Sequence, residues 1–369
     1  MPLRPYRPFF LLAALDATLG IAVWLPWASM AGRMGATGMN PGEWHRNVLL
    51  FGTIPAVLAG FLLTALPRWT GRPAAPATLT RGLAGLWLTA RAVSLVSTTA
   101  GLALSAAFML AVSSIASVQV IAVRDRRDFK VLGLLSIFCG SVVLTAAGFD
   151  PMSHRLAIAS LLGLVMVIGG RVTPALTSAF LGGQGVYVDP APSKAVERVA
   201  AATAGAALTC WLLAPQHPAT GALSAAAAVA HAVRLLRWQG WRSVASSAVT
   251  ALHVGYGWIA VGFALLALHG LEPDRLSQAA AVHAWTIGAI GTMSIAVMAS
   301  MIRRHGGRPF ARNAAATAAF ASVTASAVAR ILAEAFPVRA AFWTELSATC
   351  WIAAFVLFLW AFRDGLLRG

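Results

Sequence analysis

The apolar stretches of this chain constrain its fold more than any other feature. Twelve runs of roughly 20 apolar residues follow one another with short loops between them, and each is long enough to cross the hydrocarbon layer as a helix. Hydrophobic residues make up 59% of the 369 residues, and charged residues make up only 11%. A soluble core cannot bury that much apolar surface. The sequence therefore predicts an all-α polytopic membrane bundle of about twelve transmembrane helices.

The expected spans leave no room for a separate soluble domain, so residues 1–369 are predicted to form a single integral membrane domain. The first span is expected to be retained rather than cleaved, because it is too long for a signal peptide and carries Asp16. The spans lie near residues 9–30, 48–66, 79–98, 102–123, 131–148, 156–176, 199–213, 219–236, 247–268, 279–301, 314–336 and 340–362.

The basic residues favour one side of the predicted bundle. A net charge of +16 would suggest a nucleic-acid partner in a soluble protein, but here most of the 28 lysines and arginines fall in alternate loops. With the chain starting inside, twenty lie on the inner side and three within spans. The positive-inside rule then places both termini in the cytoplasm, with the lipid bilayer as partner and no nucleic acid. The five outer residues are Arg33, Arg46, Arg155, Arg275 and Arg339.

One segment, His283 to Pro309, places a histidine inside an apolar span that ends in a basic turn. An ionisable group within the bilayer indicates a functional site. Imidazole together with the thioethers of the same span is typical of soft-metal or haem chemistry. A pair of glycines there predicts the close approach of a neighbouring backbone. These further residues are Gly288, Gly291, Met293, Met298 and Met301.

The four histidines that are candidate ligands fall into two layers along the membrane normal. His45 and His283 are expected near the outer face, and His253 and His305 near the inner face. At about 1.5 Å per residue, His253 and His283 should lie roughly 15 Å apart along the membrane normal, so two sites are expected rather than one. The alternative for these four is a structural hydrogen bond to a backbone carbonyl. A solvated or structural role is expected for His154, His217, His231 and His269.

Charged residues within the spans suggest further contacts. Arg171 follows a glycine pair and precedes Pro174, a pattern that predicts a broken helix end where a guanidinium meets a ligand carboxylate or propionate. The alternative is an arginine that reaches for the cytoplasmic headgroups. Arg330 and Glu334 should neutralise each other across one helical turn. A mutual pair is one interpretation of the lone charges Asp16 and Arg91.

A weak internal repeat appears when the chain is compared with itself at an offset of 236 residues. Residues 47–73 then align with residues 283–309, which pairs Arg68 with Arg304 and Asn47 with His283. With one gap, Asp16 also aligns with His253. Both segments run from the outside to the inside, as a parallel repeat requires. The alternative is a chance likeness between membrane segments of similar composition.

Several short motifs in order resemble the NnrS family, bacterial membrane proteins associated with the nitric oxide response and described as binding haem and copper. The resemblance covers nearly the whole chain and implies twelve spans in a bacterial inner membrane, with intramembrane histidines as metal or haem ligands. Together with the positions above, this gives His45, His253, His283 and His305 as candidate ligands and Arg171 as a candidate cofactor contact. The motifs are Arg7–Leu12, Trp44-His45, Ala59–Ala65, Trp69–Arg72, Gly169–Val172, Leu252–Tyr256, and His283 with Gly291–Met293.

The chain departs from the family pattern at the start of the second span. Where the family usually shows His-Ala-His-Glu, this chain has His45-Arg46-Asn47-Val48, and Ser300 stands where an arginine is common. An asparagine cannot replace imidazole as a strong haem or copper ligand. The site near Asn47 is therefore expected to be altered. The three cysteines are isolated within spans and no Cys-x-x-Cys-His motif occurs, so haem b bound non-covalently is the expected cofactor, with copper as a second one.

Three classes of function follow from these features. The first is a haem- or copper-binding protein that binds or responds to nitric oxide, an apolar gas that reaches a buried metal through the bilayer. Turnover of nitric oxide, as in a reductase, is an extension of this hypothesis, although no acid chain for proton delivery is evident beyond Asp16. The second is a twelve-helix transporter of a small molecule, haem or metal. The third is a metal-free sensor or assembly partner of another membrane enzyme.

Overall fold

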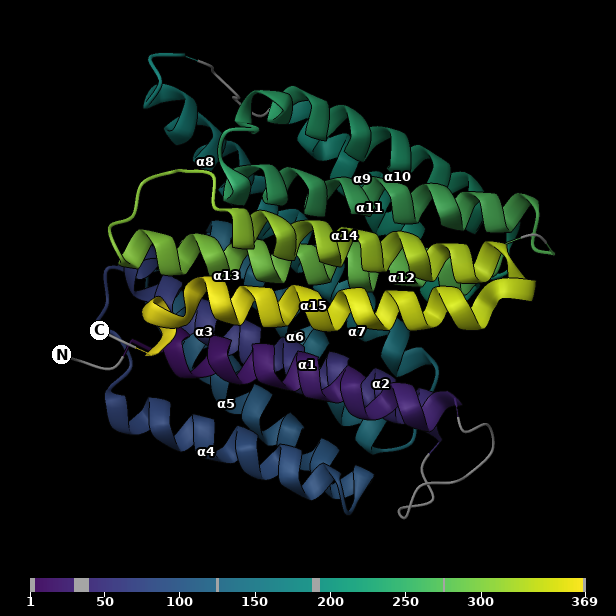
Figure 1. The fold of residues 1–369 in the computed structure, drawn as a ribbon, viewed down its shortest axis with the longest axis horizontal. Coiled ribbons are helices and arrows are strands. Elements are labelled where there is room, and N and C mark those ends of the chain that lie inside the picture. The colour runs from purple at the N-terminus through teal and green to yellow at the C-terminus, as the bar shows by residue number, and fades with distance from the viewer. Residues whose placement is uncertain (1–3, 30–39, 124–125, 188–192, 275, 368–369) are drawn as a thin grey trace. The chain divides into compact units, whose positions relative to one another are not determined.

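The computed structural model describes residues 4–29, 40–123, 126–187, 193–274 and 276–367, which form helices and turns without any strand (Figure 1). This confirms the predicted all-α membrane bundle. The chain divides into two compact units. Unit 1 comprises Met1–Leu161, Met301–Gly307 and Phe358–Gly369, and unit 2 comprises Leu162–Ser300 and Arg308–Leu357.

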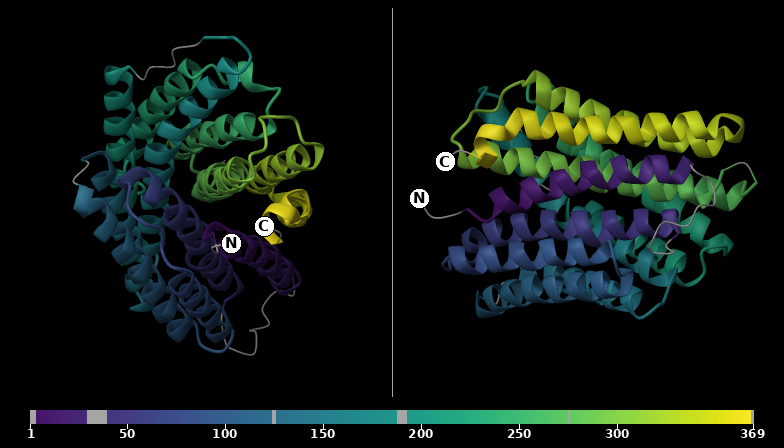
Figure 2. Two further views of the ribbon diagram at one scale, coloured as in Figure 1. Left: turned by 90° about the vertical axis from the view of Figure 1, so that its left-hand side faces the viewer. Right: turned by 60° about the horizontal axis from the view of Figure 1, so that its bottom comes forward.

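Unit 1 contains a layer of helices that pack side by side, with α1 against α3, α3 against α5, and α5 against both α4 and α6 (Figure 2). A short amphipathic helix, α2, leads into α3, and its N-terminus is capped by the side chain of Asn40, which accepts a hydrogen bond from the Gly42 amide at 2.8 Å. The helices are α1 (Tyr6–Ser29), α2 (Pro41–Val48), η1 (Leu49–Thr53), α3 (Ile54–Thr70), α4 (Ala77–Ser94), α5 (Thr98–Val123), α6 (Arg126–Ala146) and most of α7 (Met152–Leu164).

Unit 2 is built around the long helix α11, which packs against α10 and against the η4 segment, while α10 also packs against α9. The last residues of α13 and α15 belong to unit 1. The helices are η2 (Val165–Gly169), α8 (Gly170–Gly182), α9 (Lys194–Leu213), α10 (Pro218–Arg237), η3 (Gly240–Ser243), α11 (Ser247–Leu271), α12 (Gln278–His283), η4 (Ala284–Gly291), α13 (Thr292–His305), α14 (Ala314–Ala335), η5 (Pro337–Arg339) and α15 (Ala340–Leu367).

Eleven helical stretches within the described residues are long and apolar enough to cross a membrane. The one expected span that is not among them is the third, near residues 79–98, which corresponds to α4 and whose hydropathy Arg81 and Arg91 lower. That helix also ends at Ser94 rather than at the expected Thr98, which begins α5.

Two further boundaries differ from the prediction. The second span begins at Pro41 and not at Val48, so it includes His45. The tenth span continues to His305, which was expected in the following turn. Met30, the expected end of the first span, lies outside the described residues, as do Arg33, Arg124, Arg275 and Arg368 of the charge count.

Local backbone geometry supports the internal repeat. The wide-turn π-helix η1, which covers Leu49–Thr53, falls within the π-helix η4 (Ala284–Gly291) when it is shifted by 236 residues. The two segments also end alike, because Gly71 and Gly307 adopt left-handed conformations with φ of 67° and 64°. A residue with a Cβ is strained there, whereas glycine closes a helix end without that strain. Chance likeness of composition does not explain two matched irregularities at one offset.

An ion pair within unit 1 attaches α4 to its neighbours. The Arg91 guanidinium donates from Nε to Asp16 Oδ1 at 2.9 Å, and Thr53 Oγ1 donates to the second carboxylate oxygen at 2.8 Å. Nearby, the Trp87 indole donates to the carbonyl of Gly52 in η1 at 2.9 Å. The interpretation of Asp16 and Arg91 as a mutual pair is confirmed. Because each charge has a partner, α4 can pack in the bundle despite its arginine.

This packing predicts unequal effects for two glycine substitutions in unit 1. A Cβ added at Gly52 would lie 2.9 Å from Arg91 Cζ, so Gly52→Ala must displace a guanidinium that Asp16 holds in place. We expect it to destabilise the protein by about 1–3 kcal/mol. Gly82 on α4 has nothing within 4 Å of such a Cβ, so Gly82→Ala should be neutral or stabilising by up to about 1 kcal/mol. Unfolding in detergent measures both, and equal losses would contradict this packing.

Candidate functional site

His283 lies in unit 2 at the junction where α12 changes into the π-helix η4. Its Nδ1–H donates to the carbonyl of Ala279, four residues earlier, at 2.7 Å. This bond fixes the neutral tautomer, in which Nε2 carries the lone pair that a metal would use. The ring is half-buried. His283 is therefore oriented as a metal-ligating histidine commonly is, by a backbone acceptor on its other nitrogen.

The turns that follow His283 are enclosed by aromatic side chains. A Cβ on Gly288 would lie 2.5 Å from the Trp258 ring, and one on Gly291 would lie 2.8 Å from Trp351. The space at both glycines is filled by indole side chains and not by the neighbouring backbone that was expected. Trp285 is fully buried and donates from Nε1 to the carbonyl of Ile259 at 3.3 Å. The wall of unit 2 beside His283 is thus apolar and closely packed.

His305 in unit 1 has the same local geometry as His283. Its Nδ1–H donates to the carbonyl of Met301 at 2.9 Å, which again leaves the lone pair on Nε2. Its ring lies 5.1 Å from the ring of Tyr6, and its own carbonyl accepts a hydrogen bond from Arg4 Nη1 at 2.7 Å. His305 is half-buried at the basic end of α13, beside the start of α1.

His253 is packed in a way that suits a structural role better. Its Nε2–H donates to Thr177 Oγ1 at 2.8 Å, while the Thr177 hydroxyl itself donates to the carbonyl of Thr173 at 2.8 Å. The backbone of Gly240 covers the other side of the ring, where an added Cβ would lie 2.4 Å from Nδ1. Only 7% of the residue is exposed. One nitrogen is bonded and the other is covered, so a metal could reach His253 only if Gly240 moved.

The remaining two expected site residues are His45 and Arg171. His45 is half-buried in α2, and its ring is 4.6 Å from the ring of Trp24. Arg171 is exposed on α8. The expected break before Pro174 is absent, because the helix continues from the π-helix η2 through Pro174 to Gly182. The exposed side chain of Arg171 is consistent with the alternative, in which this arginine reaches for the lipid headgroups.

A buried ionic network near η2 was missed by sequence reasoning, which counted Arg234 among the inner loop residues. Arg234 is 7% exposed and donates from Nε to Glu197 Oε1 at 2.8 Å, with Nη2 donating to the other carboxylate oxygen. Its Nη1 donates to the carbonyl of Met166 in η2 at 3.1 Å and also to the hydroxyl of Tyr256. Gly170 makes room for this guanidinium, because an added Cβ would lie 2.1 Å from Nη2.

The network continues from Tyr256 into the core of unit 2. Tyr256 is fully buried, and its hydroxyl donates to Nδ1 of His231 at 2.8 Å. The ring of Trp238 lies 4.5 Å from that of Tyr256, and the Arg234 guanidinium is 5.3 Å from the Trp238 ring. His231 has the structural role expected of it. The one available signal for this network was the spacing of His231 and Arg234, which lie three residues apart on one face of α10.

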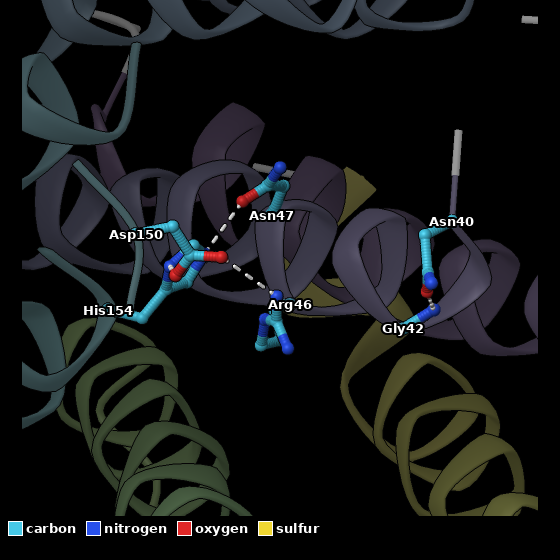
Figure 3. Close-up of polar contacts among 6 residues, drawn as sticks. All are labelled: Asn40, Gly42, Arg46, Asn47, Asp150 and His154. Atoms are coloured by element: carbon cyan, nitrogen blue, oxygen red, sulfur yellow. Dashed lines mark hydrogen bonds and ion pairs between the residues drawn. The ribbon is translucent and has the colours of Figure 1, made fainter. Parts of the chain in front are cut away.

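A polar cluster around His154 lies in unit 1, where the chain departs from the family pattern (Figure 3). His154 is buried and hydrogen-bonds through Nδ1 with Asp150 Oδ1 at 2.6 Å and through Nε2 with Asn47 Oδ1 at 2.9 Å. Arg46 reaches the other Asp150 oxygen at 3.1 Å. Both ring nitrogens of His154 are occupied, so Asn47 takes part in a closed polar contact between α2 and α7 rather than in a metal site.

The donor groups of the chain fit a haem better than a copper ion held by protein ligands alone. Within the described residues, no three His, Cys, Asp or Glu side chains lie close enough to hold one metal ion. Haem iron takes four ligands from the porphyrin and needs one axial ligand from the protein, for which a neutral imidazole suffices. His283 and His305 each present such a nitrogen.

The i, i+4 ion pair of Arg330 and Glu334 is confirmed at 2.6 Å.

The cluster in Figure 3 predicts that Asn47 matters more to stability than its neighbour Arg46. Asn47→Ala leaves the buried Nε2 of His154 without its partner, which should cost about 1–3 kcal/mol. Arg46→Gln removes an ion pair whose side chains are 46% and 33% exposed, and it should change stability by less than about 1 kcal/mol. Thermal unfolding in detergent compares the two, and a larger loss for Arg46→Gln would refute this order.

Comparison with known proteins confirms the resemblance drawn from the motifs. The chain matches the family model described as NnrS protein over residues 3–369, nearly its whole length. The chain therefore belongs to the NnrS family, and this membership supports a multi-pass membrane protein of the nitric oxide response. No curated protein matches it.

Proposed function

We propose that this chain is a haem-binding protein of the bacterial inner membrane that binds nitric oxide, with His283 as an axial ligand of the haem. The observation that carries the proposal is the hydrogen bond from His283 Nδ1 to the Ala279 carbonyl, which directs the lone pair to Nε2. Family membership supports the link to nitric oxide. A haem with an open axial position supplies an iron atom that binds this ligand.

The hydrogen bond to the Ala279 carbonyl is also the structural bond that was the alternative for His283, and two further features support the ligand role. The half-buried imidazole stands at a π-helix, a local distortion that is frequent at functional sites. The buried indoles beside the following turns exclude water, and an apolar gas that dissolves in the bilayer can reach such a place without a polar pore.

We infer the orientation of the chain from the positive-inside rule together with contacts within unit 1. Arg4 and Tyr6, at the start of the described chain, contact His305. Near the other end, a Cβ on Gly365 would lie 2.3 Å from Ile302. Both ends of the chain therefore lie at the basic end of α13, and we place that end in the cytoplasm according to the positive-inside rule.

The test is an absorption spectrum of the purified chain and two variants. We expect a Soret band in the wild type that shifts when nitric oxide is added to the reduced protein. His283→Gly should lose most of its haem, and added imidazole should restore it by filling the vacated axial position. His217→Asn is the matched control: His217 is exposed and caps α10 by accepting from the Ala219 amide, which asparagine can also do, so its haem content should be unchanged.

Two results would overturn the proposal. The first is a wild-type protein without a Soret band, even after it is supplied with haem. The second is a His283→Gly variant with full haem content and an unaltered spectrum. Uptake of haem or a metal into proteoliposomes that persists in the His283→Gly variant would favour the transporter instead.

A further inference from the structure

Three arginines from three separate segments meet around His305 in unit 1. Arg4 precedes α1, Arg68 lies in the last turn of α3, and Arg304 is in the last turn of α13. Arg4 Nη1 donates to the His305 carbonyl at 2.7 Å, which holds its guanidinium at the end of α13. Arg68 and Arg304 also act electrostatically on His305. We call Arg4, Arg68 and Arg304 the arginine cluster.

The arginine cluster gathers like charges. Each charged side chain that acts on His305 is an arginine. Like charges that are held together repel one another, and a bound anion relieves that repulsion. The internal repeat explains how the cluster arises, because Arg68 and Arg304 occupy matching positions of the two repeated segments. Each segment brings its arginine to the same end of unit 1.

We propose that the arginine cluster binds the phosphate group of an anionic phospholipid in the leaflet at the basic side of the membrane. A phosphodiester presents two charged oxygens, which guanidinium groups bind as paired hydrogen bonds. Basic pockets between transmembrane helices on the cytoplasmic side are suited to such headgroups. This inference is independent of the proposed function.

The exposure of the cluster distinguishes a headgroup from a haem propionate. Arg68 and Arg304 are exposed, whereas Arg4 is half-buried, so the cluster opens outward rather than into the bundle. Trp69, next to Arg68, is 36% exposed and packs edge-on against Phe61 with ring centroids 5.7 Å apart. Tryptophan at a helix end is typical of the headgroup level of a bilayer. A haem would instead need an apolar slot beside the arginines.

The experiment compares lipids, free phosphate and arginine variants. Delipidated protein in a neutral detergent is titrated with phosphatidylglycerol, phosphatidylcholine or inorganic phosphate, and the shift of its thermal unfolding midpoint is measured. Native mass spectrometry counts the bound lipids. We expect phosphatidylglycerol to stabilise the wild type and to remain bound, while phosphatidylcholine and phosphate have little effect.

The variants test whether the cluster is the site. One arginine near an anionic leaflet contributes about a fivefold change in affinity, so the double variant Arg68→Gln with Arg304→Gln should bind phosphatidylglycerol roughly 30-fold more weakly. The matched control is Arg198→Gln in unit 2. Arg198 is an exposed basic residue whose Nε donates to its own helix at the Lys194 carbonyl, and its loss should leave binding unchanged. A double lysine variant at the same two positions should keep part of the affinity, which shows that the fold survives.

Three outcomes would overturn this inference. Equal stabilisation by both lipids would remove the preference for a negative charge. Equal effects of inorganic phosphate and phosphatidylglycerol would assign the cluster to free phosphate. Loss of a Soret band in the double glutamine variant, with lipid binding intact, would assign the arginines to haem carboxylates. Absence of haem from the wild type would contradict the proposed function but would leave the lipid measurement unaffected.

Discussion

A buried arginine must be neutralised before a helix that carries it can pack inside a membrane bundle, and this requirement organises both units. In unit 2, Arg234 is bound by both oxygens of Glu197 and occupies the space that Gly170 leaves open. In unit 1, Arg91 is bound by one oxygen of Asp16, and Thr53 donates to the other. An unpaired charge at these depths would cost several kcal/mol. The acid, the arginine and the small residue must therefore come together from separate helices, which fixes how those helices pack.

Two of the three π-helices in the described part of the chain receive a side-chain hydrogen bond on a backbone carbonyl. The Trp87 indole donates to the Gly52 carbonyl in η1, and Arg234 of the ionic network donates to the Met166 carbonyl in η2. The third π-helix, η4, directly follows His283, to which we assign the ligand role.

The sequence was sufficient for the parts of the fold that follow from local composition. Apolar length predicted the helices, and the Arg330 and Glu334 pair followed from spacing on one helix. Arg234 could not be placed in this way. It lies near the inner end of its span, where loop arginines are common, and its partner Glu197 is 37 residues away on another helix. The helix boundary at His305 was also missed, because the hydropathy of a basic last turn resembles that of a loop. Basic residues are nevertheless favourable at a helix C-terminus.

The most direct test of this account is a double-mutant cycle on Arg234 and Glu197, with unfolding free energies measured in detergent. Glu197→Gln should cost about 3–5 kcal/mol, because it leaves the buried charge of Arg234 without its partner. Arg234→Met should cost less, because the Glu197 side chain that it leaves is 31% exposed. The double variant should cost less than the sum of the two by more than about 1 kcal/mol, since it removes both charges together. Additive losses would show that the two residues are not coupled and would contradict the central role assigned to buried charge pairing.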